Sequence, residues 1–384
     1  MSEEEPGQVL YEIRVIREDR KDWEEELVEA LAGELKSIGL HHSVAIRWST
    51  QAPSPDRPSV GLYLGSENAA RSQAVQLSAG EALDVGAVIP VVADLSRYSA
   101  EAPPALSTIN GMAWSVTSVA RALLEELGIE ERQRKVFISH RREDGLGAAE
   151  QLHDHLSHKG FEPFIDRFAI RTGAAIQERI ADALEEHAFL LLLETPLAAD
   201  SDWVFFEVDY ALSHQMGTLI ISWPGDPPPI PGSQGLPRIS LTAEELVEDD
   251  HAFDVLTGPA LDQLVGVIEA GHASGLVRRR RMLVESIKDA ATAAGYANLT
   301  LPHWRVRVER AANSTLIGTT PRLPTAHDLQ LLDQAREQPG EEAVLIHSAR
   351  LLRPERREHL RWVAGERDLL IMPENAIGAR WTTD

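Results

Sequence analysis

The feature that most constrains the fold is a regular alternation of short apolar runs and helical patterns in the middle of the chain. Residues 135–140 (KVFISH) form an apolar run that ends in polar side chains, which is typical of a buried parallel strand. A helical pattern follows, and its apolar positions are Leu146, Ala149, Leu152 and Leu156. The alternation continues with strands at 161–166, 189–194 and 218–223 and helices at 174–187 and 202–214. Strands joined by helices in this way predict an α/β fold with a parallel sheet, in which the most apolar run, 189–194, is central.

The same alternation occurs on both sides of this segment. Before it, strands are predicted at 9–16, 43–48, 59–64 and 87–92, and helices at 22–38 and 68–83. After it, strands are predicted at 304–309, 314–319, 343–347 and 368–372, and helices at 277–293, 325–336 and 353–365. A stretch with two prolines at 101–106 and one rich in proline and glycine at 223–238 interrupt the patterns. The 384-residue chain is therefore predicted to contain three α/β units, at 1–130, 131–240 and 241–384.

The first two units are related in sequence. Shifting the chain by 129 residues aligns 62–83 with 191–212 and gives eight identities in 22 positions. The triplet Arg-Glu-Asp also follows the first predicted strand of each unit, at 17–19 and 142–144. This similarity predicts that the N-terminal unit is a degenerate repeat of the middle unit, and 344–352 suggests a much weaker third copy.

The middle unit resembles the Toll/interleukin-1 receptor (TIR) domain family over about 100 residues, 133–225. Three stretches carry the resemblance: VFISHRREDG (136–145), GFEPFIDRFAIRTGAAI (160–176) and ETPLAADSDWVFFEVDYAL (194–212). The resemblance implies a flavodoxin-like parallel sheet. It also implies an enzymatic activity found in part of the family, cleavage of the nicotinamide–ribose bond of NAD+, with NAD+ as substrate and no separate cofactor.

The family's catalytic glutamate corresponds to Glu207. Cleavage of an N-glycosidic bond develops oxocarbenium character on the ribose, which a nearby carboxylate stabilises. Trp203 lies four residues earlier and therefore on the same helical face, where its indole can form a wall of the pocket. The alternative is a solvated glutamate beside a core tryptophan. In the N-terminal repeat the corresponding residues are Ser78 and Ala74, so that unit is not expected to catalyse the reaction.

Other expected substrate contacts follow the first two strands, at the sheet edge where open α/β proteins bind ligands. The resemblance favours Arg142, with Arg141, as a partner of the pyrophosphate. The alternative is a surface arginine paired with Glu143 or Asp144.

Asp166 is expected either to contact the ribose or loop, or to cap a helix. Ser139 and Phe137 are expected to line the base pocket, although Phe137 also fits a plain core position.

The loop at 167–174 corresponds to the BB loop, through which family members assemble and become active. Its residues Arg167, Ile170, Arg171 and Gly173 are therefore expected to contribute to a homo-oligomer or another TIR–TIR assembly. The flanking units would then receive an activating ligand or protein, as in a bacterial immune effector against phage.

Two other functions compete with the enzyme. The chain could be a non-enzymatic TIR adaptor, for which Glu207 would not be needed, or a receptor that binds a nucleotide signal in a flanking unit. Within the enzymatic hypothesis, sequence does not distinguish hydrolysis to ADP-ribose from cyclisation, because both begin with the same bond cleavage.

Composition excludes several other classes. A formal net charge of −23 disfavours nucleic acids and anionic membranes as partners. The absence of cysteine removes disulfides and thiolate metal sites, and the histidines lack ligand spacing, so no metal site is predicted. The acidic N-terminus does not resemble a signal peptide, and no apolar run is long enough to span a membrane. We therefore expect a cytoplasmic protein.

Overall fold

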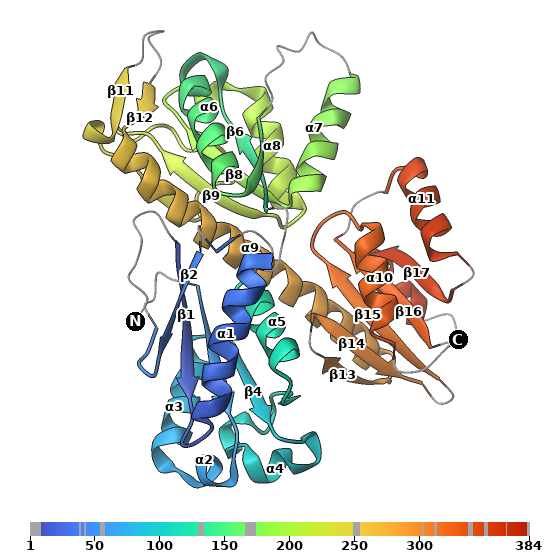
Figure 1. Cartoon of the computed structure of the whole chain (residues 1–384). Helices are drawn as coiled ribbons and strands as arrows, with labels where there is room; N and C mark the ends of the chain where they lie inside the picture. Colours follow the sequence, from blue (N-terminus) through green and yellow to red (C-terminus); the bar gives the residue numbers. More distant parts are fainter. Residues whose placement is uncertain are drawn as a thin grey trace. The chain divides into compact units, whose positions relative to one another are not determined.

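The computed structural model describes most of the chain (Figure 1). The described residues are 9–37, 40–41, 44–53, 58–129, 134–165, 174–248, 254–301, 303–310, 313–336, 341–348, 352–365 and 367–381. They divide into two compact units, one from residues 1–134, 155–161 and 258–277, and the other from 135–154, 162–257 and 278–384. Three five-stranded sheets form the framework of these units.

The N-terminal sheet is parallel, with strand order β2-β1-β3-β4-β5. Its strands are β1 (Val9–Ile16), β2 (Val44–Ser49), β3 (Ser59–Leu64), β4 (Val88–Val92) and β5 (Met112–Ala113). Its helices are α1 (Lys21–Ser37), α2 (Glu67–Arg71), α3 (Gln73–Val85), α4 (Tyr98–Glu101) and α5 (Val116–Glu126). Alternate side chains of β1 face opposite sides: Ile13 and Val15 pack in one core cluster with residues of α1 and α5, and Ile16 packs in another with residues of α3.

A buried polar cluster joins this unit to the beginning of α9 (Gly258–Ala293). Arg134 pairs with Glu269 of α9, and the hydroxyl of Tyr11 on β1 donates to the same Glu269 oxygen at 3.1 Å. Arg134 and Glu269 are each about 2% exposed at their side chains. The guanidinium of Arg134 also lies 5.0 Å from the ring centroid of Phe161. Because each group is withdrawn from water, the cluster depends on all its members being present.

The middle sheet has the order β10-β9-β8-β6-β7. Its strands are β6 (Arg134–Ser139), β7 (Phe161–Ile165), β8 (Phe189–Glu194), β9 (Gly217–Ser222) and β10 (Arg238–Ser240). The main helices are α6 (Arg142–His158), α7 (Ala174–His187) and α8 (Asp202–Ser213). The predicted parallel α/β architecture is confirmed, and the apolar strand β8 is central. Numbered along its own segment, this sheet has the order 2-1-3-4-5, which is the flavodoxin-like order and also that of the N-terminal sheet.

The C-terminal sheet is mixed and has its strands in chain order. It comprises β13 (Ala297–Leu301), β14 (Arg305–Glu309), β15 (Ser314–Thr320), β16 (Glu342–His347) and β17 (Leu369–Pro373). The first three strands pair antiparallel, and β15, β16 and β17 pair parallel. The accompanying helices are α10 (Ala326–Gln334), α11 (Pro354–Ala364) and α12 (Ile377–Trp381). This order differs from that of the other two sheets and gives the suggested third repeat no support.

Small elements complete the middle segment. The strands β11 (Leu246–Glu248) and β12 (Asp254–Leu256) form an antiparallel pair, and Gln151 of α6 exchanges two hydrogen bonds with the backbone of Leu256 at 2.7 and 2.8 Å. Among the residues that the structure describes, no helix is long and apolar enough to cross a membrane.

Candidate functional site in the middle domain

Helix α8 carries the predicted catalytic glutamate on its inner side. The helix begins after Ser201, whose hydroxyl accepts a hydrogen bond from the backbone N–H of Val204 at 3.4 Å. Glu207 is 6% exposed and lies on the buried side of α8 with Val204 and Val208. Trp203, one turn earlier, is 36% exposed. The structure thus places an enclosed carboxylate one helical turn from an accessible indole, and the interpretation of Glu207 as a solvated surface residue is wrong.

The end of β6 holds two more of the predicted residues. Phe137 is fully buried in the core cluster that contains Val204 and Val208 of α8, which fits the plain core interpretation of this residue. Ser139 is 1% exposed, and its hydroxyl makes no hydrogen bond with any described residue. A buried hydroxyl without a partner is unusual, so Ser139 offers an unused polar group at the carboxyl end of its strand.

Arg141 is held by the protein itself. Its Nη1 donates to the carbonyl oxygen of Leu197 at 2.6 Å, and its Nε donates to Glu143 at 3.1 Å. The pairing with Glu143 is the alternative that the sequence left open for this arginine. Arg142 is the first residue of α6 and is partly exposed.

Asp144 is a residue of this region that sequence reasoning treated only as a partner for arginine. Its carboxylate accepts hydrogen bonds from the hydroxyl of Thr195 and from the backbone N–H of Leu197, both at 2.8 Å. Asp144 and Arg141 together fasten the segment after β6 to the segment after β8. The sequence does carry a signal for this connecting role of Asp144. The Arg-Glu-Asp triplet directly follows a strand in both repeats, and polar residues at that position are expected to contact neighbouring loops.

A buried ion pair fixes the other side of β8. Glu194, at the end of that strand, is 2% exposed and accepts two hydrogen bonds from Arg238 of β10, at 2.9 and 3.0 Å. The hydrogen bonds to Glu194 raise the pKa of the Arg238 guanidinium. Such a two-bond pair orders the edge strand relative to the centre of the sheet.

Helix α7 contacts α8 through a polar pair and the strands β6 and β7 through aromatic rings. The hydroxyl of Tyr210 donates to Glu185 at 2.5 Å. His187, at the end of α7, contacts Phe137 and Phe164 with ring centroids 6.2 and 5.5 Å apart, and its Nδ1 faces the carbonyl of Ala183. Burial lowers the pKa of His187, so its imidazole is neutral at physiological pH.

The remaining predicted site residues lie outside the described part of the chain. They are Asp166, Arg167, Ile170, Arg171 and Gly173. Within the described residues, no group of three or more histidine, aspartate or glutamate side chains could hold a metal ion.

Comparison with known proteins identifies the domain. The family model for the TIR domain matches residues 136–257, which include most of β6, the strands β7 to β12 and the helices α6, α7 and α8. A search of curated proteins found no match to the chain. The family match, the strand order and the motifs agree, and residues 136–257 are a TIR domain.

Proposed function

We propose that the TIR domain cleaves the nicotinamide–ribose bond of NAD+, with Glu207 as the catalytic carboxylate. The observation that carries the proposal is the position of this glutamate, enclosed on α8 one turn from the accessible Trp203. The TIR family includes NAD-cleaving enzymes, and the Ser201–Trp203–Glu207 set is intact in this chain.

The proposed chemistry needs little besides a well-placed carboxylate. When the bond between the ribose C1′ and the nicotinamide nitrogen breaks, both electrons leave with the nitrogen and neutralise the pyridinium. The leaving group therefore needs no proton, and positive charge develops at C1′ next to Glu207. Addition of water gives ADP-ribose and releases one proton, whereas addition of an adenine nitrogen gives a cyclic isomer.

The burial of Glu207 fits an enzyme that is closed at rest. A carboxylate that is 6% exposed does not meet a dinucleotide unless a neighbouring segment moves. TIR domains commonly self-associate, so we propose that assembly opens the site, with the loop at 167–174 as the segment involved. In this proposal Arg142 pairs with the pyrophosphate, Ser139 contacts the substrate, and Asp166 contacts the ribose.

The test follows nicotinamide release from NAD+ by the full-length chain, over a range of protein concentrations because assembly is expected to matter. Glu207→Gln keeps the shape of the side chain and removes its charge, and should abolish turnover. Asp209→Asn removes an exposed carboxylate from the same helix and serves as the matched control. Turnover in Glu207→Gln equal to that of the wild type would refute the assignment, and mass spectrometry of the products separates ADP-ribose from a cyclic isomer.

A non-enzymatic adaptor is the second candidate. Leu197, Trp203 and Phe205 are 42%, 36% and 45% exposed, and together they give the domain apolar side chains for contact with another protein. If the domain is only an adaptor, Glu207→Gln should leave its self-association unchanged and the wild type should release no nicotinamide at any concentration. The enzyme and the adaptor therefore predict opposite results for nicotinamide release by the wild type.

A further inference from the structure

The N-terminal unit shares the strand order of the TIR domain but lacks one of its helices. In the TIR domain, 23 residues (166–188) connect β7 to β8 and include α7. In the N-terminal unit, only nine residues (50–58) connect the corresponding strands β2 and β3. This connection is shorter than α7 alone, which has 14 residues, so it cannot contain a helix of that length.

The face without this helix carries charged side chains on β1. Glu12 and Arg14 alternate with Tyr11, Ile13 and Val15, which pack in the core on the opposite side. Arg47 of β2 lies directly beside Glu12 in the strand register and pairs with it at 3.2 Å.

Arg14 occupies the place that Phe137 has in the TIR domain. Arg14 lies opposite Gly61 in the pairing of β1 with β3, and Phe137 lies opposite Leu190, which is Gly61 shifted by 129 residues. Arg14 donates to the hydroxyl of Ser78, the residue that aligns with Glu207, at 3.0 Å. The degenerate unit thus has a cation and a hydroxyl where the TIR domain has an aromatic ring and a carboxylate, and the sign of the charge is reversed.

The guanidinium of Arg14 is only partly used by the protein. Its Nη2 donates to Ser78 and, at 2.7 Å, to Glu81. Its Nε and Nη1 make no hydrogen bond with any described residue. Arg14 is only 5% exposed, so water does not readily replace the missing acceptors. Buried charged donors without acceptors are costly, so this arrangement favours an acceptor that is not part of the described chain.

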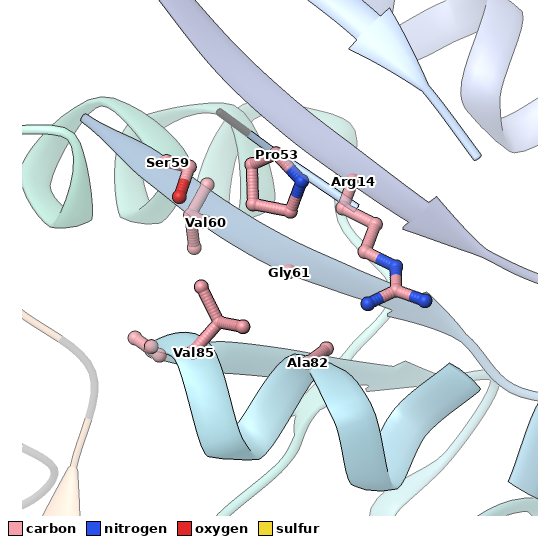
Figure 2. Close-up of a pocket in the computed structure, with 9 residues that line it drawn as sticks. Arg14, Pro53, Ser59, Val60, Gly61, Ala82 and Val85 are labelled. Carbon is pink, nitrogen blue, oxygen red and sulfur yellow. The ribbon is translucent and has the colours of Figure 1, made fainter. Parts of the chain in front are cut away.

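Arg14 is one of the residues that line a cleft in this unit (Figure 2). The cleft is formed by the start of β3, the end of α3 and the segment before β4, and the roughly 210 Å³ of empty space in and around it includes open solvent. Figure 2 shows the Arg14 side chain extending from its strand toward the side where Ala82 and Val85 of α3 lie. Gly61 lies directly opposite Arg14 in the strand pairing, and a side chain at this position would collide with Val88.

We propose that this cleft binds a small oxyanion, a phosphate or carboxylate group, through Nε and Nη1 of Arg14. An oxyanion accepts hydrogen bonds from a guanidinium in the geometry that arginine offers, and it would satisfy the two donors that Glu81 and Ser78 leave without a partner. The N-terminal unit then acts as a ligand-binding unit for the chain. This proposal does not depend on NAD+ cleavage by the TIR domain.

Two features work against tight binding. Glu81 already accepts a hydrogen bond from Nη2 of Arg14, so its negative charge competes with an incoming anion. The C-terminal end of α3 also lines the cleft, and its partial negative charge disfavours an anion. We therefore expect weak binding of the isolated anion, which removal of Glu81 strengthens.

The test measures binding of inorganic phosphate and, separately, of acetate to the full-length chain by titration calorimetry at constant ionic strength. Phosphate binding alone assigns a phosphate group, and binding of both assigns oxyanions in general. Arg14→Met should weaken binding by at least about tenfold, equivalent to about 1.4 kcal/mol. Arg71→Met, which removes an exposed arginine of α2, should leave binding unchanged.

Glu81→Gln supplies an independent measurement that keeps Arg14 in place. It should tighten binding several-fold, because it removes the competing carboxylate. The proposal is overturned if neither anion binds, if Arg14→Met and Arg71→Met lose affinity equally, or if Glu81→Gln binds no more tightly than the wild type. The Glu81→Gln result decides the question even if Arg14→Met does not fold.

Discussion

Removal of Glu269 should destabilise the N-terminal unit more than any surface change. Glu269→Leu leaves the Arg134 guanidinium buried without its carboxylate, a loss of about 3–5 kcal/mol for a broken buried pair. The Tyr11 hydroxyl loses its acceptor as well, which adds about 1–3 kcal/mol. Arginine stays protonated at all accessible pH values, so the stability of the Glu269→Leu variant itself gains no pH dependence from this cluster between pH 5 and pH 8.

The opposite single variant, Arg134→Met, should behave differently with pH. Burial raises the pKa of Glu269 above its ordinary value of 4.5, so the folded state can take up a proton that the unfolded state holds less tightly. The stability of Arg134→Met is then greatest at low pH and falls as the pH rises above about 4.5. Its loss at pH 5 should be smaller than its loss at pH 8, and smaller than that of Glu269→Leu.

The double variant, Arg134→Met with Glu269→Leu, tests the cause. It leaves only the Tyr11 hydroxyl without a partner and should cost about 1–3 kcal/mol, less than Glu269→Leu alone. Urea unfolding provides the measurement, monitored by near-ultraviolet circular dichroism of the stacked Trp23 and Trp114, whose ring centroids are 4.3 Å apart. A double variant less stable than both single variants, or a Glu269→Leu loss below about 1 kcal/mol, would refute the reasoning.

Three further predictions concern the TIR domain. Burial lowers the pKa of His187, so the unfolded chain binds a proton more readily than the folded one, and the stability should fall as the pH drops below about 6.5. His187→Phe should reduce this pH dependence in melting temperatures measured between pH 7 and pH 5. An unchanged slope of melting temperature against pH would contradict the prediction. Asp144→Ala leaves two donors without acceptors and should lower the free energy of unfolding by about 1–3 kcal/mol, with faster hydrogen exchange at the amide of Leu197. Unchanged exchange would show that the segment after β8 does not depend on Asp144. Ser201→Ala should destabilise α8 by about 1 kcal/mol and Ser201→Gly by only a few tenths in urea unfolding, and the reverse order would exclude a capping role.

The regular elements of the fold could be predicted because local pattern and tertiary structure agree. The predicted strands at 9–16, 59–64 and 189–194 match β1, β3 and β8, whose apolar residues occupy the sheet interior. The helix predicted at 68–83 is instead two helices, α2 and α3, because the backbone of Ser72 is extended. Propensity alone does not show such a break.

The first half of α9 was missed because its local signal is weak. Residues 258–276 contain four glycines, which disfavour a helix when considered without their surroundings. Packing overrides this preference, since Leu264, Val265 and Ile268 are buried. The short edge strands β5 and β10, with two and three residues, carry too little pattern to be recognised.

The candidate site was predictable in residue type but not in environment. Sequence identified Glu207, yet its burial depends on how α8 packs, which no spacing rule specifies. Sequence offered Glu143 as a neighbour of Arg141, but the shortest contact of that arginine is to the carbonyl of Leu197, 56 residues away. Partners of this kind become visible only when the ends of β6 and β8 are placed side by side.

The short connection between β2 and β3 limits how the chain could polymerise. The nine residues at 50–58 replace the entire segment that, in the TIR domain, includes 167–174 and α7. If TIR assembly uses that segment, only the TIR domain of each chain can take part in it. The N-terminal repeat lacks the segment and therefore adds no second assembly site to the chain. A polymer formed in this way would then grow by one TIR domain for each chain added.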